Sequence, residues 1–402
     1  MNITIITNVL PWKLTSGGAQ AQFNMIDLLR KKHHFTVIFP EDFQNKRSAL
    51  RELQQMWPDV NLVMYPAWRQ IFYRRFVVDK VVRAFKKLLT PNSERFKVQR
   101  TLMHYGVYPS YDFMRFVNHI IREQHTDLIQ VEFYPCLYLV HKLPKDIRKI
   151  FIHHELRFVK NQRMLASYHP TPQELEWMHT TKREELNDLN QYDAIITLTQ
   201  HDKDVLIGEG IKRPVCVSPA AVNTPCRTYK TWNHRLSFVG SYLHHPNQEG
   251  IEWYLREVVP LMKHDYPLDV IGKGWTGMTH SENVSVMGFV ADLTAVIRGS
   301  IMIVPILSGS GMRMKILEAA AMSMPIVTTS VGAEGLLFRN EESCLIADTP
   351  QDFAHAVERL AADEAFCRRL GECANQIFRE HYSKEVLAEV RSQILLATAC
   401  QA

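Results

Sequence analysis

The stretch that decides the fold is residues 304–336, VPILSGSGMRMKILEAAAMSMPIVTTSVGAEGL. An apolar run ends at Pro305, a glycine-rich loop follows, and a helical pattern begins near Met312. A second apolar run and a second glycine turn complete the stretch. A strand that leads through a glycine-rich loop into a helix, and then into another strand, is typical of a parallel sheet with crossover helices. Residues 304–336 therefore predict an α/β fold.

Short apolar, β-branched runs alternate with longer helical patterns along the rest of the chain. The predicted strands of the first half are 3–7, 36–39, 128–131, 149–152, 194–198 and 215–218. Those of the second half are 236–239, 268–271, 284–287, 302–305, 326–329 and 345–347. Each set suffices for one doubly wound sheet, so we expect two Rossmann-like domains in tandem.

Chain length agrees with two domains, because 402 residues exceed what one hydrophobic core usually serves. The pattern is interrupted at 221–233 before a new strand begins, which places the boundary there. We predict one domain at 1–222 and a second at 232–383. The apolar spacing of 384–402 predicts a C-terminal helix, which we expect to pack back on the first domain. Ligands of such folds bind at the carboxyl ends of the strands, so we expect the active site in the cleft between the domains.

Composition excludes several classes of protein. A net charge of +5, from 47 basic and 42 acidic side chains, is too mild to indicate a nucleic-acid partner. The 7 cysteines are scattered and form no Cys-x-x-Cys pair, which argues against a disulfide framework and favours a reducing compartment. The longest apolar run, 301–307, is far shorter than the roughly 20 residues that span a bilayer. We expect a cytoplasmic protein, or one that is peripheral on the inner face of the membrane.

The glycine-rich loop carries the strongest chemical signal. Gly309, Ser310 and Gly311 precede the predicted helix, and such a loop offers backbone N–H groups and a helix dipole to an anion. Arg313 and Lys315 lie in the first helical turn, where the dipole disfavours cations. A bound anion would reverse that preference. The alternative is an ordinary tight turn followed by a solvated helix face.

A carboxylate follows the glycine-rich loop and its two cations. Glu318 lies three residues after Lys315, on the same face of the helix one turn later. It is suited to accept hydrogen bonds from vicinal hydroxyls such as those of a ribose. A second glycine turn at 330–335, which contains Gly332, follows the next strand and is expected to open beside the first.

The first half contains two further candidates. The loop 8–20 contains Gly17 and Gly18, which would let a ligand approach the backbone because glycine has no Cβ. His153 and His154 follow the strand 149–152, where an imidazole can donate hydrogen bonds to sugar hydroxyls. An ordinary strand–helix turn and structural histidines are the alternatives. The histidines lack the spacing of a helical zinc site, so we predict no metal.

The basic excess is concentrated at 69–100. The cations there are Arg69, Arg74, Arg75, Lys80, Arg83, Lys86, Lys87, Arg95, Lys97 and Arg100. Aromatic residues are interleaved with them. Such a helix suits an anionic membrane surface or a lipid-diphosphate acceptor. The alternative is a solvated helix face whose aromatic side chains enter the core.

Residues 304–336 resemble the donor-site signature of the family-4 retaining glycosyltransferases of the GT-B fold, the glycosyl transferases group 1. Other segments of the second half fit the same family: Phe238-Val239-Gly240, Val270-Ile271-Gly272, and Met287-Gly288-Phe289-Val290 with Asp292. The resemblance covers nearly all of the predicted second domain and, more weakly, the first. It implies a GT-B fold, in which two Rossmann-like doubly wound parallel-sheet domains face a central cleft. The domain at 1–222 would then be the acceptor-side domain, and the domain at 232–383 the nucleotide-sugar donor domain.

The resemblance also implies roles for single residues. Glu318 matches the second carboxylate of the family's Glu-x7-Glu motif, which holds the donor ribose. His154, with His153 as second choice, matches a histidine that supports the donor hexose. The predicted catalytic residues are His154, Arg313 and Lys315. The predicted donor-binding residues are Gly17, Gly18, Gly240, Gly309, Ser310, Gly311, Met312, Glu318 and Gly332.

The sequence departs from the family pattern at two points. The first motif glutamate falls at Ser310, which we interpret as variation within a Gly-Ser-Gly subgroup rather than as inactivation. The Arg and Lys that many relatives place after the first strand of the second domain are absent from 241–250, SYLHHPNQEG. Neutralisation of the donor diphosphate would then fall on Arg313, Lys315 and backbone amides.

The implied function is a retaining, metal-independent transfer of a sugar from a nucleotide-diphosphate-sugar to a sugar or lipid-linked acceptor. The process would be the synthesis of cell-surface polysaccharide, lipopolysaccharide or glycolipid, with no cofactor. A nucleotide-sugar hydrolase or epimerase of the same fold is one alternative. A non-catalytic protein that binds nucleotide-sugars or anionic lipids is another. A phosphorylase is disfavoured, because no lysine site for pyridoxal phosphate is recognisable.

Overall fold

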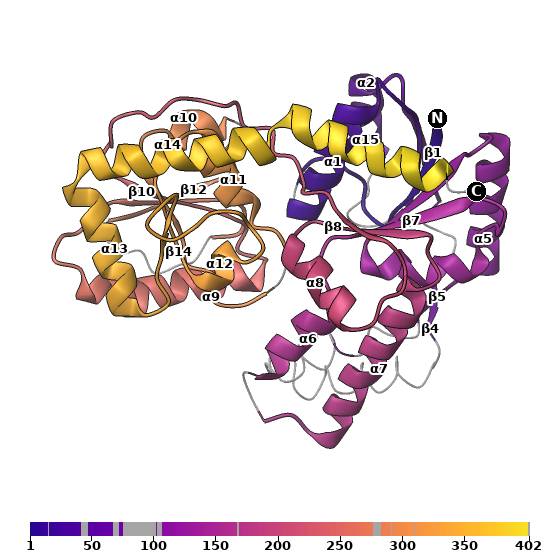
Figure 1. Ribbon diagram of the computed structural model, residues 1–402, viewed down its shortest axis with the longest axis horizontal. Helices are drawn as coiled ribbons and strands as arrows, with labels where there is room; N and C mark the ends of the chain where they lie inside the picture. Colours follow the sequence, from indigo (N-terminus) through magenta and orange to yellow (C-terminus); the bar gives the residue numbers. More distant parts are fainter. Residues whose placement is uncertain are drawn as a thin grey trace. The chain divides into compact units, whose positions relative to one another are not determined.

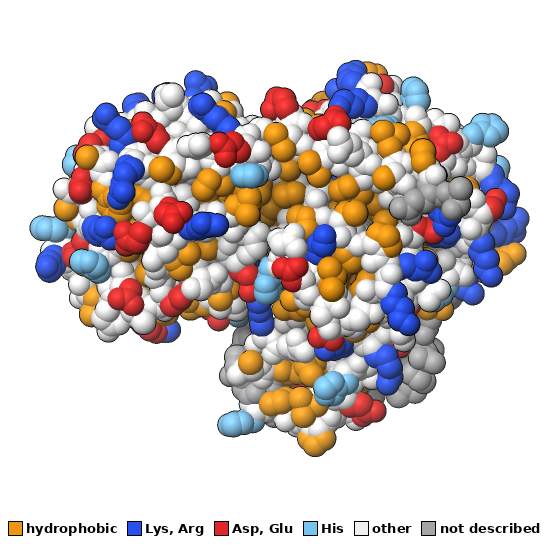
Figure 2. All heavy atoms as spheres, in the orientation of Figure 1, with side chains coloured by type: hydrophobic (Ala, Val, Ile, Leu, Met, Phe, Trp, Pro, Cys, Tyr) orange, Lys and Arg blue, Asp and Glu red, His pale blue; other side chains and the backbone are white. Residues whose placement is uncertain are grey.

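The computed structural model describes residues 1–14, 16–41, 47–66, 72–74, 102, 107–166, 169–275, 283–290, 292–309 and 311–400. The chain forms two compact units (Figure 1). Unit 1 comprises Met1–Pro219 and Ala388–Ala402, and unit 2 comprises Ala220–Leu387. Acidic and basic side chains both occur over the face of the molecule shown in Figure 2.

Unit 1 is built on a 7-stranded parallel sheet with the order β3-β2-β1-β6-β7-β8-β9. The strands are β1 (Asn2–Ile6), β2 (His34–Pro40), β3 (Asn61–Tyr65), β6 (Leu128–Glu132), β7 (Arg148–His153), β8 (Ala194–Thr197) and β9 (Val215–Val217). The inner strands are buried along nearly their whole length, as expected for a parallel sheet with both faces covered. A separate antiparallel pair consists of β4 (Phe72–Arg74) and β5 (Val107–Pro109).

Polar side chains cap the starts of several helices of unit 1. The helices described in this unit are α1 (Gly17–Leu29), α2 (Arg47–Met56), α5 (Tyr111–Glu123), α6 (Arg157–Ala166), α7 (Pro172–Leu189) and α8 (Gln200–Gly208), with a 3-10 segment η1 (Tyr134–Lys142). Ser16 caps α1 by accepting a hydrogen bond from the Ala19 N–H at 3.2 Å. Thr171 and Glu174 form a reciprocal capping box at α7. Satisfied helix ends of this kind explain why the helices begin at these residues.

The C-terminal helix α15 (Lys384–Cys400) begins in unit 2, and its residues from Ala388 onward belong to unit 1. Within unit 1, Arg391 donates from Nε to Ser218 Oγ at 2.8 Å and from Nη2 to Ser218 O at 3.0 Å. His33 Nε2 and Ser392 Oγ lie 3.1 Å apart. These buried polar contacts tie the end of the chain to unit 1.

Unit 2 contains a 6-stranded parallel sheet with the order β12-β11-β10-β13-β14-β15. Its strands are β10 (Leu236–Val239), β11 (Leu268–Ile271), β12 (Val284–Gly288), β13 (Ile301–Val304), β14 (Ile326–Thr328) and β15 (Leu345–Ile346). Its helices are α9 (His245–Trp253), α10 (Leu293–Ile297), α11 (Met314–Ala321), α12 (Ser330–Ala333), α13 (Pro350–Ala362) and α14 (Glu364–His381), with short segments η2 (Tyr254–Val258) and η3 (Val259–Leu261) after α9. One apolar core fills this unit and includes Phe238, Ile303 and Leu317.

The predicted α/β architecture is confirmed, since both sheets are parallel and doubly wound. The strands predicted from apolar runs are present, with ends displaced by at most two residues. β3, β4 and β5 were not predicted. Among the described helices, none combines the length and the apolar character that crossing a bilayer demands.

Candidate functional site

The candidate donor site lies at the point where the strand order of unit 2 reverses. β10 pairs with β11 on one side and with β13 on the other, so the loops after β10 and β13 diverge at the carboxyl edge of the sheet. Open α/β sheets bind ligands at such a point. The loop after β10 leads into α9, and the loop after β13 leads into α11.

Lys315 occupies the centre of this region. Its Nζ donates a 2.7 Å hydrogen bond to Asn247 Oδ1 in α9 and lies 4.0 Å from the centre of the Phe238 ring in β10. Asn247 in turn donates from Nδ2 to Ser241 O at 2.9 Å. β10, α9 and α11 therefore meet at the Lys315 amine.

The electrostatic setting of Lys315 is unusual for a lysine. Burial lowers its pKa, the nearby Arg313 charge adds to this effect and the Glu318 carboxylate opposes it, with the net result that the pKa of Lys315 is about 7. An amine with such a pKa is only partly protonated at neutral pH. An anion bound beside it would favour the charged form.

Arg313 and Glu318 flank Lys315 on the same segment. Arg313 is the N-cap residue of α11, is only 9% exposed, and donates from Nη1 to Gly311 O at 2.5 Å. Glu318 is 6% exposed and lies one turn into α11. The structure thus gathers the two predicted cations and the predicted carboxylate at the start of one helix. Their roles toward a donor stay predictions.

The backbone conformation of the loop between β13 and α11, which we call the donor loop, explains two of its glycines. Gly309 and Gly311 adopt φ values of +95° and +82°, which L side chains rarely tolerate. Ser310 lies outside the described residues. Met312 packs against the apolar core of unit 2.

The other two predicted glycines of unit 2 are packed tightly. A Cβ on Gly240 would lie 2.5 Å from Asn247 Nδ2, so glycine is required there for the amide to reach Lys315. A Cβ on Gly332 would lie 2.1 Å from Thr328 Oγ1. The Gly332 N–H also donates to Thr329 Oγ1 at 2.9 Å. Packing and capping of α12 therefore suffice to explain Gly332.

Helix α9 also holds the beginning of the donor loop, which sequence reasoning missed. A Cβ on Gly250 would lie 2.1 Å from Pro305 O, so the helix and the backbone after β13 are in direct contact. Ser308 donates from Oγ to the Glu249 carboxylate. These contacts fix the position of the loop relative to α9.

In unit 1, three loops meet at the carboxyl edge of β1, β6 and β7. The Phe133 ring, directly after β6, stacks on the His154 ring with centroids 4.1 Å apart and an interplanar angle of 10°. A Cβ on Gly18 would lie 2.7 Å from Phe133 Cε1. Phe133 has a φ of +67°, a costly conformation for an aromatic residue. The predicted residues Gly18 and His154 are thus brought together through Phe133.

His154 is held by a carboxylate that the sequence analysis did not select. Its Nε2 lies 2.9 Å from Glu132 Oε2 in the last position of β6. A carboxylate accepts, so Nε2 carries the proton in this pair. Gln130 Nε2 donates to the other Glu132 oxygen at 2.5 Å. The His154 Nε2–H is therefore already engaged.

His153 has a purely internal explanation. Its Nε2 lies 2.8 Å from Glu185 Oε1, and both side chains are almost completely buried. Glu185 also accepts from the N–H groups of Arg157 and Phe158, each at 2.9 Å, at the start of α6. This network orders α6 against β7, and it accounts for His153 without a ligand.

Gly18→Ala and Gly17→Ala form a matched pair of neighbours that tests the contact with Phe133. An added methyl group meets nothing within 4 Å at Gly17. We expect Gly17→Ala to be neutral or to stabilise α1 by up to about 1 kcal/mol. Gly18→Ala should destabilise by about 1–3 kcal/mol, because the ring must move. Urea unfolding checks both, and equal stability of the two variants would contradict the constraint.

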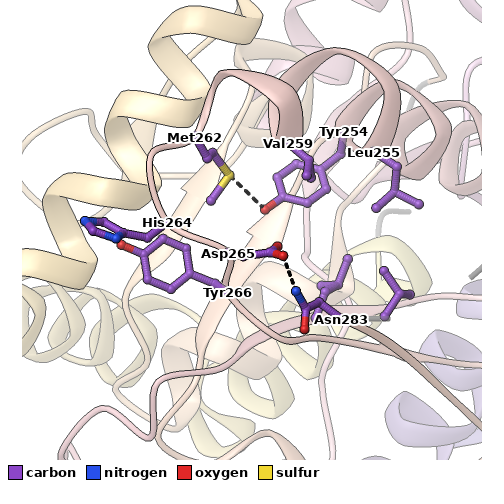
Figure 3. A pocket seen from close by; sticks show the side chains of 10 residues that line it. Tyr254, Leu255, Val259, Met262, His264, Asp265, Tyr266 and Asn283 are labelled. Atoms are coloured by element: carbon purple, nitrogen blue, oxygen red, sulfur yellow. Dashed lines mark hydrogen bonds between the residues drawn. The ribbon is translucent and has the colours of Figure 1, made fainter. Parts of the chain in front are cut away.

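A small pocket at the amino ends of β11 and β12 is lined by Tyr254, Leu255, Val259, Met262, His264, Asp265, Tyr266, Leu268, Asn283 and Val284 (Figure 3). Two pairs of side chains there are hydrogen-bonded to each other: Tyr254 donates to Met262 Sδ, and Asn283 donates to Asp265. It lies at the opposite end of these strands from the loops described above.

The stretch 69–100 lies outside the described residues, except for the backbone of β4 (Phe72–Arg74). The predicted binding of an anionic membrane surface stays a prediction. Within the described part of the chain, no cluster of three or more His, Cys, Asp or Glu residues is arranged to hold a metal ion.

Residues 233–363 match the family model described as "Glycosyl transferases group 1". That range contains β10, α9 and the whole of α11. Unit 2 carries a group 1 glycosyltransferase domain. The resemblance stated from residues 304–336 is thereby confirmed at the level of this group.

Solved structures resemble the whole chain in fold. Sucrose-phosphate synthase from Thermosynechococcus elongatus has a TM-score of 0.70 at 14% identity, over 100% of both chains. TarM has a TM-score of 0.69 at 10% identity, over 100% of this chain and 99% of TarM. Anabaena HepE in complex with UDP-glucose has a TM-score of 0.68 at 12% identity, over 98% of this chain and 99% of HepE. The predicted GT-B fold is confirmed by these likenesses.

A curated relative adds a sequence match. It is an uncharacterized 44.6 kDa protein in the cps region of Klebsiella pneumoniae, 26% identical over 175 residues. The match covers 39% of this chain and spans less than half, 45%, of the relative.

Proposed function

We propose that the protein is a retaining glycosyltransferase that moves a sugar from a nucleoside diphosphate sugar to an acceptor, without a metal ion. The observation that carries the proposal is the cluster of Arg313, Lys315 and Glu318 at the switch point of a group 1 domain. Cations beside a helix N-terminus suit a diphosphate, and a carboxylate one turn later suits a ribose.

The proposed mechanism is mainly electrostatic. Bond cleavage leaves negative charge on the departing diphosphate, and Arg313, Lys315 and the loop N–H groups would stabilise it. Glu318 would anchor the ribose, so that the diphosphate lies beside Lys315. We assign no enzymatic nucleophile. The acceptor hydroxyl would attack the face that the diphosphate leaves, as the bond from the sugar to the diphosphate breaks, and would pass its proton to the departing diphosphate.

We infer UDP as the nucleotide of the donor, because solved structures of similar fold contain it. HepE was solved with UDP and glucose, and the pneumococcal O-GlcNAc transferase GtfA with UDP and GlcNAc. The acceptor would be a sugar or a lipid-linked sugar in the synthesis of cell-surface polysaccharide, lipopolysaccharide or glycolipid. The relative in a cps region supports the first of these.

A two-step experiment tests the function. UDP-, GDP- and ADP-sugars are first compared by thermal shift on the full chain, and we expect UDP-sugars to raise the melting temperature most. Sugar release from the labelled donor is then measured with and without a pool of lipid-linked acceptors. Release that depends on the acceptor supports transfer. Release without acceptor would indicate a hydrolase, and the absence of any nucleotide effect would contradict the proposal.

Activity should persist in excess chelator. In the proposed mechanism, Arg313 and Lys315 supply the positive charge that a divalent cation supplies elsewhere. We expect transfer rates with and without EDTA to agree within about twofold. Loss of activity in EDTA, with rescue by Mg²⁺ or Mn²⁺, would overturn the metal-free mechanism.

A further inference from the structure

Among the described residues, the immediate partners of the Lys315 amine are uncharged. Nζ contacts the Asn247 carbonyl oxygen and the face of the Phe238 ring. Phe238 is completely buried, and Asn247 is 7% exposed. The charged groups that act on Nζ, Arg313 and Glu318, come from the same helical segment and have opposite effects. The residues of β10 and α9 that contact the amine are therefore dipolar or aromatic groups, not a counterion.

The two hydrogen bonds of the Asn247 side-chain amide are compatible with only one of its two orientations. Its Oδ1 accepts from Lys315, and its Nδ2 donates to the backbone carbonyl of Ser241. The opposite orientation would place an N–H₂ group against the lysine and an oxygen against a carbonyl. Gly240 has no side chain where this amide lies, since a Cβ would be 2.5 Å from Nδ2. The loop after β10 is shaped to fix this amide.

We propose that Asn247 is a positioning residue that holds the Lys315 amine at the switch point, and that a bound nucleoside diphosphate makes this amine take up a proton. The proton comes from solvent and forms a bond to the lone pair of Nζ, and the diphosphate supplies the compensating negative charge. The inference rests on the proposed function, because it takes the donor site to be at these loops.

An amide suits this role better than a carboxylate would. An aspartate at position 247 would keep Lys315 permanently protonated and would cancel the charge that the diphosphate needs. An asparagine orients the amine without neutralising it. The full positive charge then appears when the anion arrives, at a partly buried position where water screens the attraction less than at an exposed site.

The first measurement is calorimetry of UDP binding to the full chain. Titrations at pH 8 in two buffers with different ionisation enthalpies report the protons taken up. We expect close to one proton to be taken up per UDP bound, because the pKa of Lys315 in the protein without UDP is about 7. Above pH 7 the terminal phosphate of UDP is already largely ionised. Affinity should fall as pH rises, by about 50-fold between pH 7 and pH 9, since the neutral amine must first be protonated.

Variants separate the role of Asn247 from a general effect on folding. Asn247→Asp should bind UDP more weakly at pH 7 and lose most of the pH dependence, with a change under about threefold between pH 7 and pH 9. Lys315→Arg should lose the proton uptake, because arginine is always charged. Gln248→Ala is the matched control, since this neighbouring amide of α9 bonds Tyr242 and Glu252 instead. It should retain the wild-type pH profile.

The outcomes distinguish the inference from the proposed function. If the wild type fails to bind UDP or any other nucleoside diphosphate, the donor-site proposal itself fails. If UDP binds without proton uptake and with a flat pH profile, the inference is overturned while the proposed function stands. A wild-type pH profile in a folded Asn247→Asp variant would remove Asn247 from the role. Asn247→Ala, if it folds, should weaken binding but keep the proton uptake.

Discussion

Glu318→Ala is expected to weaken donor binding by about 10- to 150-fold while the fold stays intact. The expectation follows from the loss of a charged hydrogen-bond acceptor to a ligand, which costs about 1.5–3 kcal/mol. Glu318 is buried at 6% exposure in α11, beside the two cations proposed to hold the diphosphate. Calorimetry with UDP and steady-state kinetics with the UDP-sugar measure the effect.

The same substitution has a second consequence through Lys315. The Glu318 carboxylate favours the protonated form of this lysine, so its removal should lower the pKa of Lys315 below the present value of about 7. The loss of UDP affinity should therefore be larger at pH 8 than at pH 6.5. Glu318→Gln keeps a hydrogen-bond acceptor and should fall between the wild type and Glu318→Ala. Unchanged donor affinity and turnover in Glu318→Ala would remove Glu318 from the site.

The fold was accessible from sequence because its strands are buried on both faces. β13 (IMIV) is a continuous apolar run, and β7 (RKIFIH) contains the apolar run 150–152. Such runs can be recognised without knowing which strands lie beside them. β3 was missed because it lies at the edge of the unit 1 sheet, where its residues NLVMY are only partly buried. The glycine loop was recognisable because the positive φ values of Gly309 and Gly311 require glycine.

Partners across the sheet could not be predicted in the same way. Asn247 and Lys315 are 68 residues apart, and their contact depends on β10 and β13 being neighbours. Hydrophobic patterns define strands but not their order. Glu132 left a usable signal, since it is a carboxylate directly after the predicted strand 128–131. Such a residue lies at the ligand edge of any parallel sheet, next to the histidines that follow 149–152.

Gly250→Ala is expected to destabilise unit 2 and to weaken donor binding together. The added methyl carbon would lie 2.1 Å from Pro305 O and 3.0 Å from Pro305 C. Both atoms are backbone, so no flexible side chain can move aside. Either α9 or the loop after β13 must shift, and overpacking of this kind costs about 1–3 kcal/mol or more. The preference of helices for alanine over glycine, about 1 kcal/mol, offsets only part of that.

The shift caused by Gly250→Ala would act on the donor site through the contacts of α9 that hold it. Glu249 directly precedes Gly250 and accepts a hydrogen bond from Ser308. Asn247 lies one turn before Gly250 and accepts a hydrogen bond from the Lys315 amine. UDP affinity should therefore fall even under conditions in which the variant is fully folded. Gly208→Ala is the matched control, because that helical glycine has nothing within 4 Å of an added Cβ. Urea unfolding should show a loss for Gly250→Ala and none for Gly208→Ala, and calorimetry should show normal UDP binding only for the control. If Gly250→Ala retains both stability and UDP affinity, α9 does not hold the donor loop in place.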